Sequence, residues 1–167
     1  MQNDMTYSRY HRQIILNGFG NQSQERLHHA RVLVIGAGGL SCPALQYLCG
    51  AGVGTIGVVD GDVVSLSNLH RQILFAIDDI GKNKAIAAAE HLKLLNDAIV
   101  INSYPVFISN ENAASLIAEY DYVFDGTDDL AAKYLINDVC VLLGKPLVYG
   151  AVTGYEGQVS VFNCKKP

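Results

Sequence analysis

Short apolar runs alternate with amphipathic segments along most of this 167-residue chain. The runs are rich in β-branched residues, as in strands buried on both faces of a parallel sheet. They predict strands at 31–36, 55–60, 100–106, 122–125, 147–151 and 158–162. The segments between them predict helices at 22–29, 40–50, 84–95, 112–119 and 130–143. Strands that alternate with helices indicate the α/β class, with a mainly parallel central sheet and helices on both faces.

Residues 32–62 carry the most informative pattern. An apolar run enters the turn Gly36-Ala37-Gly38-Gly39, a helical stretch follows, and a second apolar run ends at Asp60. This order is typical of a nucleotide-binding unit, because glycines let the backbone approach a phosphate and the helix start presents free N–H groups to it. An acid that closes the second strand is placed to accept a hydrogen bond from a ribose hydroxyl. We therefore expect a Rossmann-like three-layer fold.

Composition narrows the class of protein. Half of the residues are hydrophobic, so a packed domain over 1–167 is expected, with an N-terminal helical arm at 1–30 and a core at 31–167. The net charge of −4 argues against non-specific binding to nucleic acid. Glycine and polar residues interrupt every apolar segment, so no membrane span is expected. The N-terminus lacks the apolar core of a signal peptide, and a cytoplasmic location follows by default.

The cysteine pattern offers neither a zinc site nor a redox motif. The four cysteines, Cys42, Cys49, Cys140 and Cys164, include no C-x-x-C pair. Three lie in apolar surroundings and are expected to be buried, reduced thiols. Cys164 stands alone near the end of the chain, where a structural role is favoured over a catalytic one.

Polar residues follow the predicted strands at the end where ligands bind in open parallel sheets. Asp60 and Asp62 follow the second strand, and Asp128 and Asp129 follow the strand at 122–125. The connection at 61–81 is long for a compact domain, which is typical of a functional loop. It contains Asn68, Arg71 and Gln72.

The lysines near the start of the helix at 84–95 favour ATP over NAD. Lys82 and Lys84 would face the positive end of the helix dipole, which disfavours cations by roughly 0.3–1 kcal/mol each. A strong anion nearby would reverse that sign, and with Arg71 it suggests several phosphates. A carboxylate such as Asp128 suits Mg²⁺, which binds one or two carboxylates together with phosphate oxygens. A nicotinamide cofactor needs no such metal.

At this point the sequence resembles a known family. The runs SRYHRQIILNGFG, GAGGLS, DGDVVSLSNLHRQILF, GKNKA and GTDD are similar to those of the ThiF/MoeB/HesA family, the bacterial relatives of ubiquitin-activating enzymes. The resemblance covers essentially the whole chain. It implies adenylation of the C-terminal glycine carboxylate of a ubiquitin-like sulfur-carrier protein that ends in Gly-Gly, with release of pyrophosphate. It does not choose between thiamine, molybdopterin or another pathway.

The resemblance also implies roles for single residues. Gly36, Gly38 and Gly39 would form the phosphate turn, and Asp60 would hold the ribose. Asp62 would lie near the metal and phosphates, and Asp128 would bind Mg²⁺. The remaining nucleotide contacts would come from Asn68, Arg71, Gln72 and Lys84. Arg12, in the motif R-Y-x-R-Q, would reach into the site of the partner subunit of a homodimer.

These residues suit the chemistry. The attacking carboxylate is already ionised, so the reaction needs no general base. The obstacle is the approach of an anion to a polyanion, and Arg12, Arg71, Lys84 and Mg²⁺ would offset that repulsion.

Three features depart from the family pattern. Ser41 replaces the last glycine of G-x-G-G-x-G, and Gly126 and Asp129 replace the cysteine and asparagine of C-T-D-N. The paired C-x-x-C zinc motifs of the family are missing, which suggests truncation. These departures motivate an alternative, a non-catalytic nucleotide-binding member. A third possibility, an NAD-dependent oxidoreductase, leaves Arg71, Lys84 and Asp128 without a role.

Structural roles compete with the functional ones. Taken without the other residues, Asp128 is better explained as the cap of the helix near Leu130, a role also open to Thr127 or Asp129. Arg71 would suit a surface ion pair with Asp78 or Asp79. Lys82 is expected to be a solvated surface charge.

Overall fold

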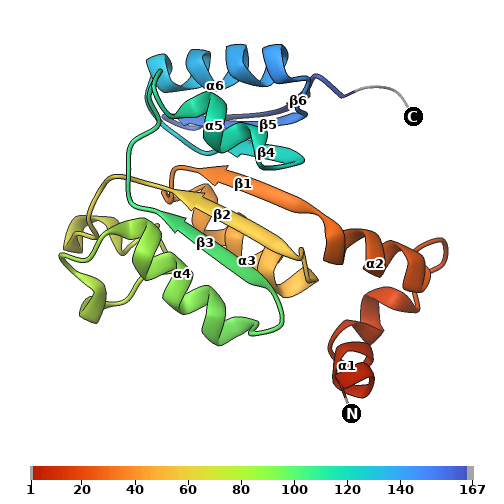
Figure 1. Ribbon diagram of the computed structural model, residues 1–167. Helices are drawn as coiled ribbons and strands as arrows, with labels where there is room; N and C mark the ends of the chain where they lie inside the picture. Colours follow the sequence, from red (N-terminus) through yellow and green to blue (C-terminus); the bar gives the residue numbers. More distant parts are fainter. Residues whose placement is uncertain (1, 165–167) are drawn as a thin grey trace.

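The computed structural model describes residues 2–164, with side chains described from Ser8 onward. Six strands form one sheet in the order β3-β2-β1-β4-β5-β6 (Figure 1). All pair in parallel except β6, which is antiparallel to β5. The strands are β1 (Arg31–Ile35), β2 (Thr55–Val59), β3 (Val100–Tyr104), β4 (Tyr122–Asp125), β5 (Leu147–Thr153) and β6 (Glu156–Phe162). The predicted three-layer α/β fold is confirmed.

The helices flank this sheet and precede it. They are α1 (Gln2–Ile14), α2 (Gly20–His29), α3 (Ser41–Ala51), α4 (Lys84–Leu95), α5 (Ala113–Ala118) and α6 (Leu130–Leu143). The apolar pattern predicts every one of them except α1, which is mostly polar. The turns η1 (Leu66–Asn68) and η2 (Ile77–Asp79) lie in the long connection. Within the part of the chain described, no helix is long and apolar enough to cross a bilayer.

Strand β1 supplies both halves of the core, because successive side chains of a strand point to opposite faces. Val32 and Val34 face α3 and α4, whereas Leu33 and Ile35 face α5 and α6. Figure 1 shows these two pairs of helices on opposite sides of the sheet. Burial on both faces explains why the strands read as continuous apolar runs.

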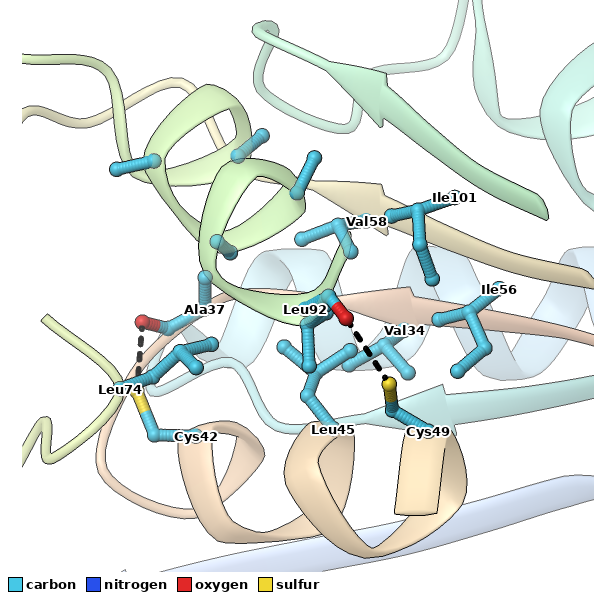
Figure 2. Packing of buried hydrophobic residues seen from close by; sticks show 14 of the residues in the cluster. Val34, Ala37, Cys42, Leu45, Cys49, Ile56, Val58, Leu74, Leu92 and Ile101 are labelled. Atoms are coloured by element: carbon cyan, nitrogen blue, oxygen red, sulfur yellow. Dashed lines mark hydrogen bonds between the residues drawn. The ribbon is translucent and has the colours of Figure 1, made fainter. Parts of the chain in front are cut away.

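The α3 side of the core contains two of the cysteines (Figure 2). Cys42 donates to the carbonyl oxygen of Ala37 at 3.6 Å, and Cys49 donates to that of Leu92 at 3.3 Å. Burial raises the pKa of both thiols to about 11, and burial raises that of Cys140 likewise. The prediction of three buried, free cysteines is confirmed, while Cys164 is exposed.

Helix α1 packs against the amino-terminal end of the sheet, where α3 and α4 finish. The hydroxyl of Tyr10 accepts a hydrogen bond of 2.8 Å from Asn96. Arg9 donates to the carbonyl oxygen of Leu95 at 3.0 Å, and Gln13 donates to that of Ala51 at 2.9 Å. The bonds from Arg9 and Gln13 satisfy carbonyl groups at the C-termini of α4 and α3, which helices leave unpaired.

Candidate nucleotide-binding cleft

The order of the strands reverses at β1, which lies between β2 and β4. The turns that follow β1 and β4 therefore meet at the carboxyl edge of the sheet, where open α/β sheets bind ligands. The contact is close, since the amide of Gly126 donates to the carbonyl oxygen of Ile35 at 3.0 Å. A Cβ on Gly36 would lie 3.2 Å from the carbonyl oxygen of Gly126.

A cleft of about 1490 Å³ opens over these two turns. It brings together every site residue predicted from the sequence except Arg12. Those lining it are Gly36, Gly38, Gly39, Asp60, Asp62, Asn68, Arg71, Gln72, Lys84 and Asp128. The residues come from the glycine turn, the end of β2, the long connection, the start of α4 and the turn after β4.

The glycine turn favours glycine at one position and is covered by an arginine side chain at another. Gly36 has φ of +84°, a conformation that residues with a Cβ rarely adopt. A Cβ on Gly39 would lie 3.4 Å from Cγ of Arg71, so the stem of Arg71 packs directly over the turn. The guanidinium group of Arg71 has no carboxylate within 4.0 Å among the described residues. The alternative in which Arg71 pairs with Asp78 or Asp79 is not realised. The guanidinium group donates to the carbonyl oxygen of Ser67 at 3.3 Å and lies beside the turn without an acidic partner.

Helix α3 starts from this turn without a side-chain cap. Its N-cap residue is Leu40, and no described side chain accepts from the N–H groups of the first turn. Helices α4 and α6 begin at the same edge, and each is capped, by Asn83 and Asp129 respectively. An uncapped helix start favours an anion, because its free N–H groups and its dipole both attract negative charge.

Lys84 is the first residue of α4 and is only 7% exposed. Its Nζ lies 3.1 Å from the carboxylate of Asp62, so the two predicted residues are paired with each other. The helix bounds are those predicted, so Lys84 begins α4 and Lys82 lies two residues before it. Lys82 pairs with Asp79 at 3.1 Å and Glu90 at 3.6 Å.

Asp60 joins the end of β2 to the glycine turn. Its carboxylate accepts hydrogen bonds from the backbone amides of Ala37 at 2.7 Å and Asp62 at 2.8 Å. Burial raises the pKa of Asp60 above its ordinary value, although these two bonds and the charge of Lys84 oppose the rise. The carboxylate lines the cleft and retains acceptor sites beyond those two bonds.

The structure separates the two aspartates of the motif G-T-D-D. Asp129 caps α6, since its carboxylate accepts from the amide of Ala132 at 2.8 Å. Asp128 is exposed and has no hydrogen bond or ion pair with any described residue. No cluster of three or more His, Cys, Asp or Glu side chains suited to a metal occurs within the described range. A metal here would depend on Asp128 together with ligand oxygens, as Mg²⁺ commonly does.

One buried polar atom indicates that the cleft suits a polar ligand. Gln72 is 4% exposed, and its Oε1 accepts no hydrogen bond from the described residues. Buried polar atoms are nearly always paired. An uncapped helix start, a guanidinium group without a carboxylate and this side-chain oxygen all lie in one cleft. Together they fit a nucleoside phosphate, which carries both anionic groups and hydrogen-bond donors.

The sequence analysis missed a buried ion pair beneath the cleft. Lys133 lies 3.1 Å from Asp125, donates to the carbonyl oxygen of Gly150 at 2.9 Å and faces the ring of Tyr149. Asp125 also accepts from the amide and hydroxyl of Thr127 at 2.9 and 2.7 Å. The pair thus fixes the turn that carries Asp128. A lone lysine inside a helix gives no sequence signal for this role, because its partners are distant in the chain.

Arg12 is the predicted site residue that lies elsewhere. It is exposed on α1, at the opposite end of the sheet from the cleft, and it does not line that cleft in its own chain. A role for Arg12 within one isolated chain is therefore not supported.

Comparison with known proteins identifies the family and agrees with the fold. The model of the ThiF family matches residues 10–167, and the chain belongs to that family. It is 51% identical over 155 residues to a sulfur carrier protein adenylyltransferase of Thermus thermophilus, covering 93% of this chain and 57% of that protein. It is 48% identical over 155 residues to a probable adenylyltransferase/sulfurtransferase, MoeZ, of Mycobacterium tuberculosis, covering 93% of this chain and 40% of that protein.

A solved structure shares the fold of this chain. The E. coli tRNA N6-threonylcarbamoyladenosine dehydratase TcdA in complex with ATP matches with a TM-score of 0.83 and 28% identity, covering 89% of this chain and 61% of that chain. The present chain spans only part of each of these proteins, about half the length of the Thermus thermophilus relative.

Proposed function

We propose that this protein binds ATP with Mg²⁺ and adenylates the C-terminal Gly-Gly carboxylate of a ubiquitin-like sulfur-carrier protein. The observation that carries the proposal is the packing of Arg71 over Gly39, with no carboxylate partner, in the cleft that also contains Lys84 and Asp128. The names of the relatives as a sulfur carrier protein adenylyltransferase and as a probable adenylyltransferase, and the ATP complex of the structural neighbour, support the choice of reaction.

In this proposal each part of the cleft has one task. The glycine turn and the uncapped start of α3 bind phosphate oxygens, and Asp60 holds the ribose. Asn68 and Gln72 offer amide groups to the nucleotide, and Asp128 is the protein ligand of Mg²⁺. Asp62, paired with Lys84, lies beside the metal and phosphates.

ATP supplies the adenylyl group and the pyrophosphate leaving group. A carboxylate oxygen of the carrier attacks the α-phosphorus, and the bond from that phosphorus to the bridging oxygen breaks. Arg71 and Lys84 stabilise the negative charge that develops on the leaving pyrophosphate. No proton has to move, because the carboxylate is ionised at neutral pH.

The proposal includes a homodimer in which Arg12 completes the cleft of the partner subunit. The position of Arg12 at the far end of its own sheet supports this part. Mixing an Arg12→Ala chain with an Asp128→Ala chain should restore one working site per mixed dimer. Mixed dimers that remain inactive would exclude a shared site.

A cytoplasmic location is also part of the proposal, supported by the free thiols. The carrier, and with it the thiamine or molybdopterin pathway, is left to experiment.

The test of the proposed reaction is exchange of labelled pyrophosphate into ATP, with Mg²⁺ and a carrier that ends in Gly-Gly. Asp128→Ala should lower the exchange rate at least about a hundredfold. The matched control is Asp97→Ala, which removes an exposed aspartate remote from the cleft and should leave the rate unchanged. ATP binding without exchange in the wild-type protein would favour the non-catalytic alternative. Tight NAD binding that ATP does not displace would favour the oxidoreductase.

A further inference from the structure

The turns after β1 and β4 also meet through one pair of side-chain positions, Ser41 and Gly126. Ser41 is the first residue of α3 and is fully buried. A Cβ built on Gly126 would overlap the hydroxyl oxygen of Ser41, yet it would lie 3.4 Å from Cβ of Ser41 and 3.2 Å from Cε1 of Phe124. The single oxygen atom of Ser41 is therefore the main obstacle to a side chain at position 126.

The backbone at position 126 does not itself require glycine. Gly126 is not among the glycines with positive φ, whereas its neighbour across the contact, Gly36, has φ of +84°. An alanine at 126 would thus meet a steric obstacle and no conformational strain. At Gly36 both would arise, because its φ disfavours a Cβ and the atoms nearby belong to the backbone.

The hydroxyl of Ser41 makes no hydrogen bond within the part of the chain described. A buried hydroxyl without a partner lowers stability, so hydrogen bonding does not explain its presence. Its evident physical effect is to fill the space between the two turns. Ser41 and Gly126 are also two of the positions at which the chain departs from the pattern described above, and the structure places these two positions in contact.

We propose that Ser41 and Gly126 form a steric interlock that sets the separation between the glycine turn and the turn carrying Asp128. Ser41 is then a positioning residue of the cleft. The contact of Ser41 with Gly126 is independent of any reaction, whereas its effect on ATP binding rests on the proposed function.

The interlock is tested by a cycle of Gly126→Ala, Ser41→Ala and the double variant. Gly126→Ala should lower the melting temperature by about 5 °C or more, as expected for overpacking. Ser41→Ala should leave it unchanged or raise it. The double variant should return to within about 2 °C of the wild-type protein, because only ordinary contacts then surround the new methyl group. Gly50→Ala, also in α3 but with no atom within 4 Å of the added Cβ, controls for the change from glycine to alanine.

The positioning role is tested by titrating ATP with and without Mg²⁺ into the same variants. Gly126→Ala should weaken ATP binding about tenfold and remove most of the gain in affinity that Mg²⁺ provides. The double variant should recover both, because the two turns regain their separation. A merely structural contact would change the melting temperature and leave the Mg²⁺ dependence unaltered.

A Gly126→Ala protein as stable as the wild type, or a double variant as unstable as Gly126→Ala alone, would overturn the interlock. Recovery of stability with ATP affinity equal in all variants would overturn the positioning role. Failure of the wild-type protein to bind ATP would instead count against the proposed function, and the thermal cycle would then decide the interlock alone.

Discussion

Helices α3 and α6 lie on opposite faces of the sheet and both begin at the cleft, but their first turns differ. At α6, Asp129 accepts from the amide of Ala132 at 2.8 Å and closes the helix end. At α3, the N-cap is Leu40, and no described side chain performs this task. The protein satisfies the start of one helix from its own sequence and leaves the other open to an anion.

The charged residues around the cleft divide in the same way. Lys133 and Lys84 have carboxylate partners in Asp125 and Asp62, each at 3.1 Å. Arg71 lies over the glycine turn without one among the residues described. Asp128 likewise has no bonded partner there, unlike Asp129. The pair of Lys133 with Asp125 supports the turn that carries Asp128, whereas Arg71 and Asp128 have no oppositely charged partner among the described residues and are free to engage a ligand.

The largest effect is expected at the most deeply buried ion pair, that of Lys133 with Asp125. Lys133→Met leaves the carboxylate of Asp125 buried and uncompensated, which should lower the free energy of unfolding by about 3–5 kcal/mol. Urea denaturation measures the loss. Asp125→Asn in the Lys133→Met background should recover part of it, since the uncompensated charge is gone. Equal stability of Lys133→Met and the wild-type protein would show that the pair does not anchor the turn.

A smaller effect is expected at Asp79, a buried carboxylate in the long connection between β2 and α4. Burial alone would raise the pKa of Asp79, but bonds from the amide of Ala76, from His91 and from Lys82 outweigh it and lower the pKa from 3.8 to about 2. Ionised Asp79 therefore stabilises the fold by about 2 kcal/mol above pH 4, and this contribution is lost as the pH falls toward 2.

Denaturation should show that the free energy of unfolding of the wild-type protein exceeds that of Asp79→Asn. This difference should be largest near pH 6 and should become smaller as the pH approaches 2. A difference of constant size over that range would contradict the assigned role of Asp79.

A negative charge at the uncapped start of α3 should weaken ATP binding and should change the stability of the fold only slightly. Leu40→Asp places a carboxylate at the positive end of the α3 dipole, which should stabilise the helix by about 0.3–1 kcal/mol. The same charge repels phosphates and should weaken ATP binding about tenfold or more. Leu40→Asn, nearly the same shape without the charge, should bind more tightly than Leu40→Asp. Calorimetric titration that finds the two variants equal would place the phosphates elsewhere.

The smallest effect is expected at the closed helix start. Asp129→Ala removes the cap of α6 and should lower the free energy of unfolding by about 1 kcal/mol. Thermal unfolding measures the shift. ATP affinity should change far less than in Asp128→Ala. The reverse ranking would assign the nucleotide role to Asp129 and the structural role to Asp128.

Much of this arrangement could be predicted from local pattern. The apolar run before Gly36 and the run before Asp60 define adjacent parallel strands, so the glycine turn and the acidic residue had to meet at one edge. The residues 61–81 lacked periodicity, yet their length indicated a functional loop, and Asn68, Arg71 and Gln72 do line the cleft.

Other features depend on contacts that no local pattern records. The sequence offered Asp128 as the cap of α6, with Thr127 and Asp129 also within reach of the helix start, and only the backbone geometry selects Asp129. Lys133 and Asp125 are eight residues apart and pair through the fold. The overlap of Ser41 with position 126 joins segments from two different strands. Helix α1 is mostly polar, so the apolar pattern did not give it separate bounds within the helical arm predicted at 1–30.

Calorimetric titration of ATP with Mg²⁺ into the wild-type protein, Arg71→Ala and Arg9→Ala tests the central claim most directly. Arg71 packs over the glycine turn with no carboxylate partner among the described residues, whereas Arg9 donates to the carbonyl oxygen of Leu95 at the far end of the sheet. We expect ATP to bind the wild-type protein and Arg9→Ala alike, and Arg71→Ala at least about tenfold more weakly, a difference of about 1.4 kcal/mol. Equal binding by all three proteins would contradict the account.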